Sequence, residues 1–195
     1  VGLSDDGKIV AMNRDIELTT ALDLLEDKMI PALELNETHL IEPVHEILDD
    51  RELTDVLIIS KDPDIVKEIR TLNDEYRGVV RFEGTVLNET DLKSILTSVR
   101  DSTGLVAMID HRALSLENVH YFRSRALTVW GYGVATEAEA HRLITLGVSG
   151  IEAAEHSSVT AALKEYDTEN SINQPPIIVA HRGMSALAPE NTIPA

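Results

Sequence analysis

The stretch Leu127–Ile151 (LTVWGYGVATEAEAHRLITLGVSGI) decides the fold that the sequence predicts. It begins in an apolar run, Ala126–Trp130, and continues into the capping-box pattern Thr136-Glu137-Ala138-Glu139, which marks the start of a helix. Gly147 is the residue type that commonly ends a helix, and Val148–Ala153 is the next apolar run. A strand, a helix and a second strand in this order predict parallel strands joined by a crossover helix.

The same alternation extends over the whole chain. Most candidate strands are continuous apolar runs, which is typical of strands buried on both faces. They are Ile9–Met12, Ala32–Leu35, Val56–Ser60, Gly78–Phe82, Leu105–Ile109, Ala126–Trp130, Val148–Ala153 and Ile177–Ala180. Further helix starts are expected at Thr38, Asp62-Pro63, Asn88 or Thr90, and Ser157. Eight strands in such units favour a TIM (β/α)8 barrel over an open sheet, although periodicity alone does not separate the two.

Composition limits the class of protein. A net charge of −17 argues against nucleic acid or an anionic membrane surface as a direct partner. The absence of cysteine excludes disulfides and thiolate metal sites and leaves the cellular location unassigned. No apolar run approaches the roughly 18 residues of a membrane span. The chain does not begin with Met and is shorter than the about 250 residues of a typical α/β barrel, so we expect a piece of a longer protein.

The most specific motif lies in Pro175–Ala195. It consists of the apolar run Ile177–Ala180, then His181-Arg182-Gly183, then Pro189-Glu190-Asn191-Thr192. This stretch resembles the opening strand and first active-site loop of the glycerophosphodiester phosphodiesterase family. The resemblance implies a TIM barrel of the phospholipase C-like phosphodiesterase type. It also implies hydrolysis of glycerophosphodiesters to sn-glycerol 3-phosphate and an alcohol, with a divalent metal, Ca²⁺ or Mg²⁺.

The rest of the chain resembles the same family in the family's own order, but starting late. The resemblance is good over residues 127–151 and weaker in the middle of the chain. Lys8–Thr20 resembles the hairpin that usually carries a His-Asp pair in this family. The second catalytic His of the family falls on Asn13 and its Asp partner on Arg14, while the Lys that follows the third-strand Glu is Asn36. The family's Glu-x-Asp metal pair would lie just before Val1. Residues 1–166 therefore resemble a degenerate copy that lacks its first strand.

These departures predict an incomplete or circularly permuted barrel. We expect a linker over residues 167–176, which are polar and end in two prolines. Residues 177–195 would then be the first strand and loop of a following copy. Because a barrel is cyclic, Ile177–Ala180 can fill the first strand's place, either within one chain or by strand swapping in a homo-oligomer.

The resemblance assigns roles to residues at the strand ends, where barrels carry their chemistry. His181 would transfer protons, since the unperturbed pKa of histidine lies near 6.5. Arg182 would bind phosphate through its planar, permanently charged fork. Glu190 and Asn191 are candidates for substrate binding, and the alternative is that they cap the helix that follows.

Two further candidates lie in residues 1–166. Glu34 matches the family's third metal carboxylate, and the alternative is a solvated strand end. Trp130 resembles an aromatic residue near the substrate glycerol, and the alternative is a core residue. Asp110-His111-Arg112 follows a strand without a second motif, which favours a solvated loop. Glu152, after the last strand, is a weaker candidate for a polar rim.

Two functions remain open from the sequence. The first is a metal-dependent glycerophosphodiester phosphodiesterase acting on a small molecule. The present chain would be inactive alone, because it holds one catalytic His and at most one family metal ligand. The second is a non-catalytic, degenerate barrel that binds a ligand or acts as a scaffold.

Overall fold

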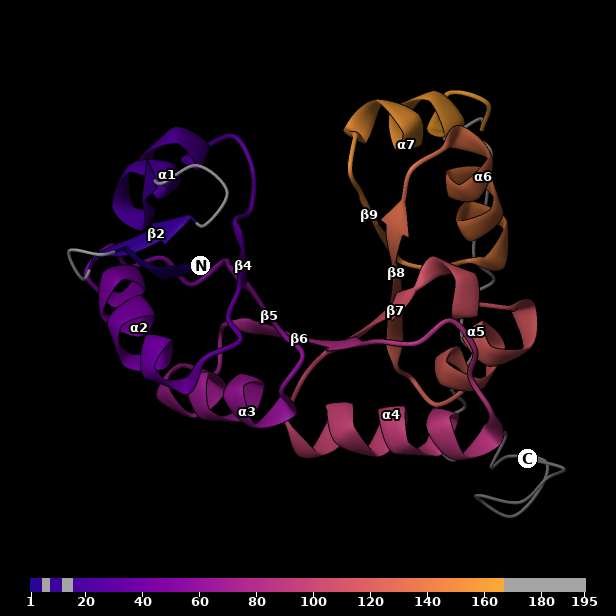
Figure 1. Ribbon diagram of the computed structural model, residues 1–195, viewed down its shortest axis with the longest axis horizontal. Helices are drawn as coiled ribbons and strands as arrows, with labels where there is room; N and C mark the ends of the chain where they lie inside the picture. Colours follow the sequence, from indigo (N-terminus) through magenta and orange to yellow (C-terminus); the bar gives the residue numbers. More distant parts are fainter. Residues whose placement is uncertain (5–7, 12–15, 167–195) are drawn as a thin grey trace, which may run out of the picture.

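A curved, parallel six-stranded sheet forms the centre of the protein (Figure 1). The computed structural model describes residues 1–4, 8–11 and 16–166. The strands are β4 (Ala32–Glu34), β5 (Leu57–Ser60), β6 (Arg77–Phe82), β7 (Val106–Asp110), β8 (Thr128–Val134) and β9 (Gly150–Ala153). They lie side by side in chain order. The fold is an incomplete TIM barrel, an arc whose two edges, β4 and β9, are not paired with each other.

Helices cover the outer face of the arc (Figure 1). They are α2 (Ile41–Asp49), α3 (Pro63–Leu72), α4 (Glu89–Asp101), α5 (Leu116–Arg123), α6 (Glu137–Leu146) and α7 (His156–Leu163). Short 3₁₀ turns, η1 (Thr38–Leu40) and η2 (His111–Ala113), follow β4 and β7. The strands and helices alternate along the chain, as the sequence pattern predicts.

Side chains alternate between the two faces of the sheet. Ile58, Val80 and Ile109 point outward and belong to the buried clusters shared with the helices. A separate inner cluster contains Ile59, Val79, Val106, Met108 and Tyr132, with Leu57 and Trp130 packed against it. The strands are therefore apolar on both faces along most of their length, which explains their continuous apolar sequences.

Local signals place the helix ends. The Asp62 carboxylate accepts a hydrogen bond from the backbone N–H of Asp64 at 2.9 Å, with Pro63 as the first residue of α3. Thr136 forms the expected capping box at the start of α6. Gly147 ends α6 with φ of 78°, the left-handed conformation that glycine adopts without a steric cost.

Counting Ile9–Met12 among the barrel strands is wrong, whereas the resemblance of Lys8–Thr20 to a hairpin is confirmed by the antiparallel pairing of its two strands. Here β2 (Ile9–Ala11) pairs antiparallel with β1 (Gly2–Leu3) and β3 (Ile16–Glu17) in a separate three-stranded sheet. The connections between these strands are a few residues long. Parallel pairing would need a crossover of a dozen or more residues, so only antiparallel pairing is open to them. The helix α1 (Leu18–Leu25) follows β3 and leads back to β4. The eighth candidate strand, Ile177–Ala180, lies outside the described residues.

Candidate functional site

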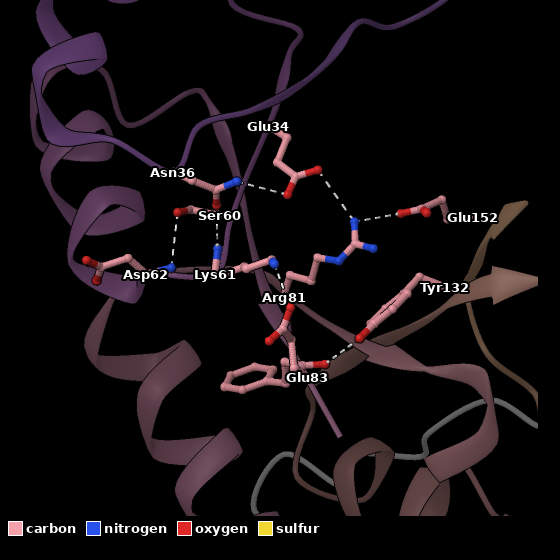
Figure 2. Close-up of polar contacts among 10 residues, drawn as sticks. Glu34, Asn36, Ser60, Lys61, Asp62, Arg81, Glu83, Tyr132 and Glu152 are labelled. Carbon is pink, nitrogen blue, oxygen red and sulfur yellow. Dashed lines mark hydrogen bonds and ion pairs between the residues drawn. The ribbon is translucent and has the colours of Figure 1, made fainter. Parts of the chain in front are cut away.

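A group of polar side chains lies on the inner side of the arc, where the parallel strands end (Figure 2). We call it the polar mouth, and it consists of Glu34, Lys61, Arg81, Glu83, Tyr132 and Glu152. The residues come from β4, β6, β8 and β9 and from the positions that follow β5 and β6. The carboxyl ends of barrel strands are the positions that carry function in this fold.

Arg81 joins the two edges of the sheet. Its Nη1 lies 3.5 Å from Glu34 Oε2 on β4 and 3.2 Å from Glu152 Oε2 on β9 (Figure 2). The Arg81 side chain is 19% exposed, whereas those of Glu34 and Glu152 are 38% and 42% exposed. The guanidinium carbon lies 4.1 Å from the centre of the Tyr132 ring, a cation–π contact. One largely enclosed cation therefore serves two carboxylates from the two ends of the arc.

Further hydrogen bonds hold the other side chains of the polar mouth, some of them through its neighbour Asn36. Asn36 donates from Nδ2 to Glu34 Oε1 at 3.1 Å, and its Oδ1 accepts from the backbone N–H of Lys61 at 3.3 Å. The Lys61 ammonium pairs with Glu83, and this hydrogen bond lowers the pKa of the Glu83 carboxyl. Tyr132 donates its hydroxyl hydrogen bond to the carbonyl of Phe82 at 3.1 Å. Burial raises the pKa of the Tyr132 hydroxyl, so this residue is a neutral donor at neutral pH.

The sequence favoured a solvated loop for Asp110-His111-Arg112, and this is wrong for its first two residues. Asp110 and His111 are both buried, because they end β7 and begin η2 under the α5 and α6 layer. The guanidinium of Arg112 donates to the two Asp110 oxygens at 2.9 and 2.6 Å, and the Arg112 backbone N–H donates as well. The hydrogen bond from the Arg112 side chain is the main cause that lowers the pKa of the Asp110 carboxyl.

His111 makes few polar contacts. Its Nδ1 is buried without a hydrogen-bond partner among the described residues, and its Nε2 lies 3.9 Å from Glu139 Oε1. Its carbonyl accepts a hydrogen bond from Arg142, which ties η2 to α6. These two contacts of His111 are therefore with residues of α6.

The lowered pKa of Asp110 should make the free energy of unfolding depend on pH in the acid range. Because its pKa is lowered in the folded state, its contribution is present above about pH 4 and is lost as the pH falls through the lowered value. We expect Asp110→Asn to lower the free energy of unfolding at pH 6, and the difference from wild type to shrink at pH 3. Urea unfolding at the two pH values measures this difference. The exposed Asp101→Asn is the control, and an equal effect of both variants would contradict the assignment.

The structure places two of the candidate residues from the sequence. Glu34 lies at the end of β4, with Arg81 and Asn36 as its partners. Trp130 lies on the inner face of β8 against the inner cluster, and a Cβ on Gly150 would come within 2.6 Å of its ring. Their metal and substrate roles stay predictions. The other four candidates, His181, Arg182, Glu190 and Asn191, lie outside the described residues, as do Asn13 and Arg14.

Arg81 is the residue that the sequence analysis missed. It stands inside the apolar run Gly78–Phe82, and a charge in a strand that is buried on both faces calls for a partner. The alternation of β6 puts Arg81 on the same face as Val79, which identifies the inner side of the barrel. Glu152, expected at a polar rim, supplies one of its two partners.

A second group of possible metal ligands lies on the outer layer of the arc. Donor atoms of Glu137 and His141 on α6 and of Glu165 after α7 all lie within 4.8 Å of one another. His141 Nε2 is 3.1 Å from Glu165 Oε2, and its Nδ1 is 2.9 Å from the Tyr166 hydroxyl. A hydrogen bond between an imidazole and a carboxylate has this length, so the contacts alone do not require a metal.

A sheet of parallel strands with helices on the outside and polar side chains at the carboxyl ends defines a TIM-barrel protein. The sequence model of the glycerophosphoryl diester phosphodiesterase family matches residues 6–152. The chain therefore belongs to this family, whose named members are hydrolases. No curated protein matches the sequence significantly.

Solved structures support the same fold. A protein from Silicibacter pomeroyi DSS-3, provisionally described as a glycerophosphoryl diester phosphodiesterase, has 17% identity and a TM-score of 0.68 over 77% of this chain and 56% of its own. A similarly described protein from Agrobacterium tumefaciens C58 has 11% identity and a TM-score of 0.70 over 77% and 64%. The Oleispira antarctica phosphodiesterase OLEI02445, in complex with the product sn-glycerol-3-phosphate, has 15% identity and a TM-score of 0.67 over 76% and 61%.

The chain spans about 56–64% of the length of these three structures. It lacks, among the described residues, the two strands that would close the arc into an eight-stranded barrel. No helix in the described part of the chain has the length and apolar character needed to cross a membrane.

Proposed function

We propose that this chain is a barrel segment that binds glycerophosphodiesters at the polar mouth and does not hydrolyse them by itself. Hydrolysis to sn-glycerol 3-phosphate and an alcohol needs the family elements that the polar mouth does not supply. The observation that carries this proposal is the position of Arg81 between Glu34 and Glu152. The carboxylates at the mouth already hold a cation, and no histidine in the described part of the chain bonds to them.

Substrate binding is supported by the chemistry of the inner face. Two aromatic residues, Trp130 and Tyr132, belong to the inner face of β8, and the Arg81 guanidinium covers the Tyr132 ring. Lys61 is the second cation of the polar mouth (Figure 2). A phosphodiester carries one negative charge, which lysine and arginine recognise, and aromatic rings cover apolar parts of a small ligand. The product complex of the Oleispira protein shows that a related barrel binds sn-glycerol 3-phosphate.

The proposed catalytic residues are His181 and Arg182, with Glu190 and Asn191 beside the substrate. Cleavage of a phosphodiester needs a proton-transfer group and charge on the phosphoryl oxygens, and a histidine and an arginine are suited to these tasks. In the family, Ca²⁺ or Mg²⁺ would provide further charge when bound between carboxylates. The polar mouth residues do not fit such an ion, because Arg81 already pairs with Glu34.

Closure of the barrel belongs to the same proposal. Strand β9 is one edge of the arc, and Ile177–Ala180 follows it after α7. A strand added there through a crossover helix has the usual right-handed parallel arrangement. We propose that this segment, from the same chain or from a neighbouring chain, pairs with the arc. A chain ended at residue 166 would then be less stable than the full 195 residues.

The single tryptophan reports on binding directly. Trp130 is the only tryptophan of the chain, and it lies on the inner face. Titration with glycerophosphocholine should change its fluorescence emission saturably, and Lys61→Met should weaken the apparent affinity about tenfold, as expected for one charge-assisted hydrogen bond. Lys67→Met on the outer helix α3 is the matched control and should leave the affinity unchanged. No saturable change at millimolar ligand, or equal effects of both variants, would contradict binding at the mouth.

A further inference from the structure

Arg81 occupies the place where a bound cation would neutralise the mouth. Its guanidinium lies between carboxylates from β4 and β9, the two edge strands, and reaches both from the middle of the sheet (Figure 2). A positive charge between carboxylates of different strands is the arrangement by which a Ca²⁺ or Mg²⁺ ion is held. Here the charge is part of the chain.

The contacts leave little opportunity for a second cation at Glu34. One Glu34 oxygen faces Arg81, and the other accepts a hydrogen bond from Asn36 at 3.1 Å. A divalent ion on this carboxylate would also meet the positive charge of Arg81 at close range, where charges repel strongly in a partly enclosed site. Metal binding would therefore require Arg81 to move away.

Arg81 is held in place by more than its ion pairs. Its guanidinium covers the ring of Tyr132, and that ring is fixed in turn by the hydroxyl's hydrogen bond to the Phe82 carbonyl. The Arg81 side chain is only 19% exposed. Because its guanidinium lies over the Tyr132 ring, turning Arg81 into solvent would uncover that ring. Arginine also keeps its charge at all ordinary pH values, so this cation does not titrate away.

We propose that Arg81 is a built-in cation that replaces the divalent metal beside Glu34, and that it closes the polar mouth to Ca²⁺ and Mg²⁺. Removal of Arg81 uncovers Glu34 and Glu152 together and creates a divalent-metal site from a metal-free one. This inference holds whether or not the mouth binds a phosphodiester, because it concerns only the competition between two cations for the same carboxylates.

Terbium luminescence tests the proposal with a readout that needs no activity. Tb³⁺ binds at oxygen-rich sites that accept Ca²⁺, and Trp130 and Tyr132 on the inner face can sensitise its emission. All proteins in the series carry His141→Ala, which removes the imidazole from the outer Glu137, His141 and Glu165 group. Arg81→Met is compared with the parent, and Arg81→Met with Glu34→Gln is the matched control. Circular dichroism checks that each variant is folded.

The expected result is weak or absent sensitised emission in the parent. Arg81→Met should bind Tb³⁺ at least tenfold more tightly, Ca²⁺ should displace the Tb³⁺, and Glu34→Gln should abolish the gain. A folded Arg81→Met that gains no binding would overturn the proposal. A second comparison tests the proposal even if Arg81→Met does not fold. If the parent binds Tb³⁺ or Ca²⁺ at the mouth and Glu34→Gln alone removes that binding, Arg81 does not exclude metal.

Discussion

Phe122→Ala is expected to lower the free energy of unfolding by about 3–5 kcal/mol, the usual cost of truncating a fully buried phenylalanine. Phe122 lies on α5, is fully buried, and belongs to the large outer cluster that joins β6, β7 and β8 to α4, α5 and α6. Its removal leaves a cavity among side chains from several elements, which cannot all move to fill it. Since domains of this size are stable by only about 5–15 kcal/mol, the variant should unfold at much lower urea concentration.

A control on the same helix separates packing from helix propensity. Leu116 is the first residue of α5 and is 67% exposed. Leu116→Ala should change the free energy of unfolding by less than about 0.5 kcal/mol, as is usual for an exposed position. Similar effects of Leu116→Ala and Phe122→Ala in urea unfolding would mean that α5 does not pack on the sheet as described.

Much of the fold was predictable because strands and helices here obey strong local rules. Runs such as Val56–Ser60 and Leu105–Ile109 are apolar on both faces, so their sequences indicate buried parallel strands directly. The capping box at Thr136 and the left-handed Gly147 define the first and last residues of α6. The run Ile9–Met12 has a similar apolar composition but pairs antiparallel. The short connections on either side of it, rather than its own residues, determine this pairing.

Two described helices, α1 and α5, were not expected from the sequence, and α5 was missed for a local reason. The capping box that begins α5 pairs Ser115 with Asn118 instead of the usual glutamate or glutamine. A search for the common pattern passes over it. The buried face of α5, which includes Phe122, can be recognised only once its packing against the sheet is known.

The polar mouth was less predictable than the fold. Glu34 was found by its resemblance to a family motif, but its pairing with Arg81, and that of Arg81 with Glu152, was not predicted.

 Arg81 follows Glu34 by 47 residues and precedes Glu152 by 71 residues. Separations of this size become contacts only through the curvature of the sheet, which no local pattern encodes. Asp110 and His111 were misjudged for a similar reason, since their burial comes from the helices packed over η2.

The second large effect concerns hydrolysis, where the presence or absence of catalysis changes a rate by roughly 10⁶-fold or more. We expect the purified 195-residue chain to release no sn-glycerol 3-phosphate from glycerophosphocholine above the rate in buffer. In the polar mouth Arg81 pairs with both Glu34 and Glu152, and in the described part of the chain no histidine contacts these two carboxylates. The resemblance to the family also predicts that the proposed proton-transfer residue His181 has no second histidine in this sequence, because Asn13 falls on the matching position.

The most direct test is ³¹P NMR of glycerophosphocholine incubated with the chain in Ca²⁺, in Mg²⁺ and in EDTA. The Oleispira antarctica phosphodiesterase serves as the positive control. The account predicts product formation at the buffer rate under all three conditions, with His181→Ala indistinguishable from wild type. Metal-dependent product release by the wild-type chain that disappears in His181→Ala would contradict it.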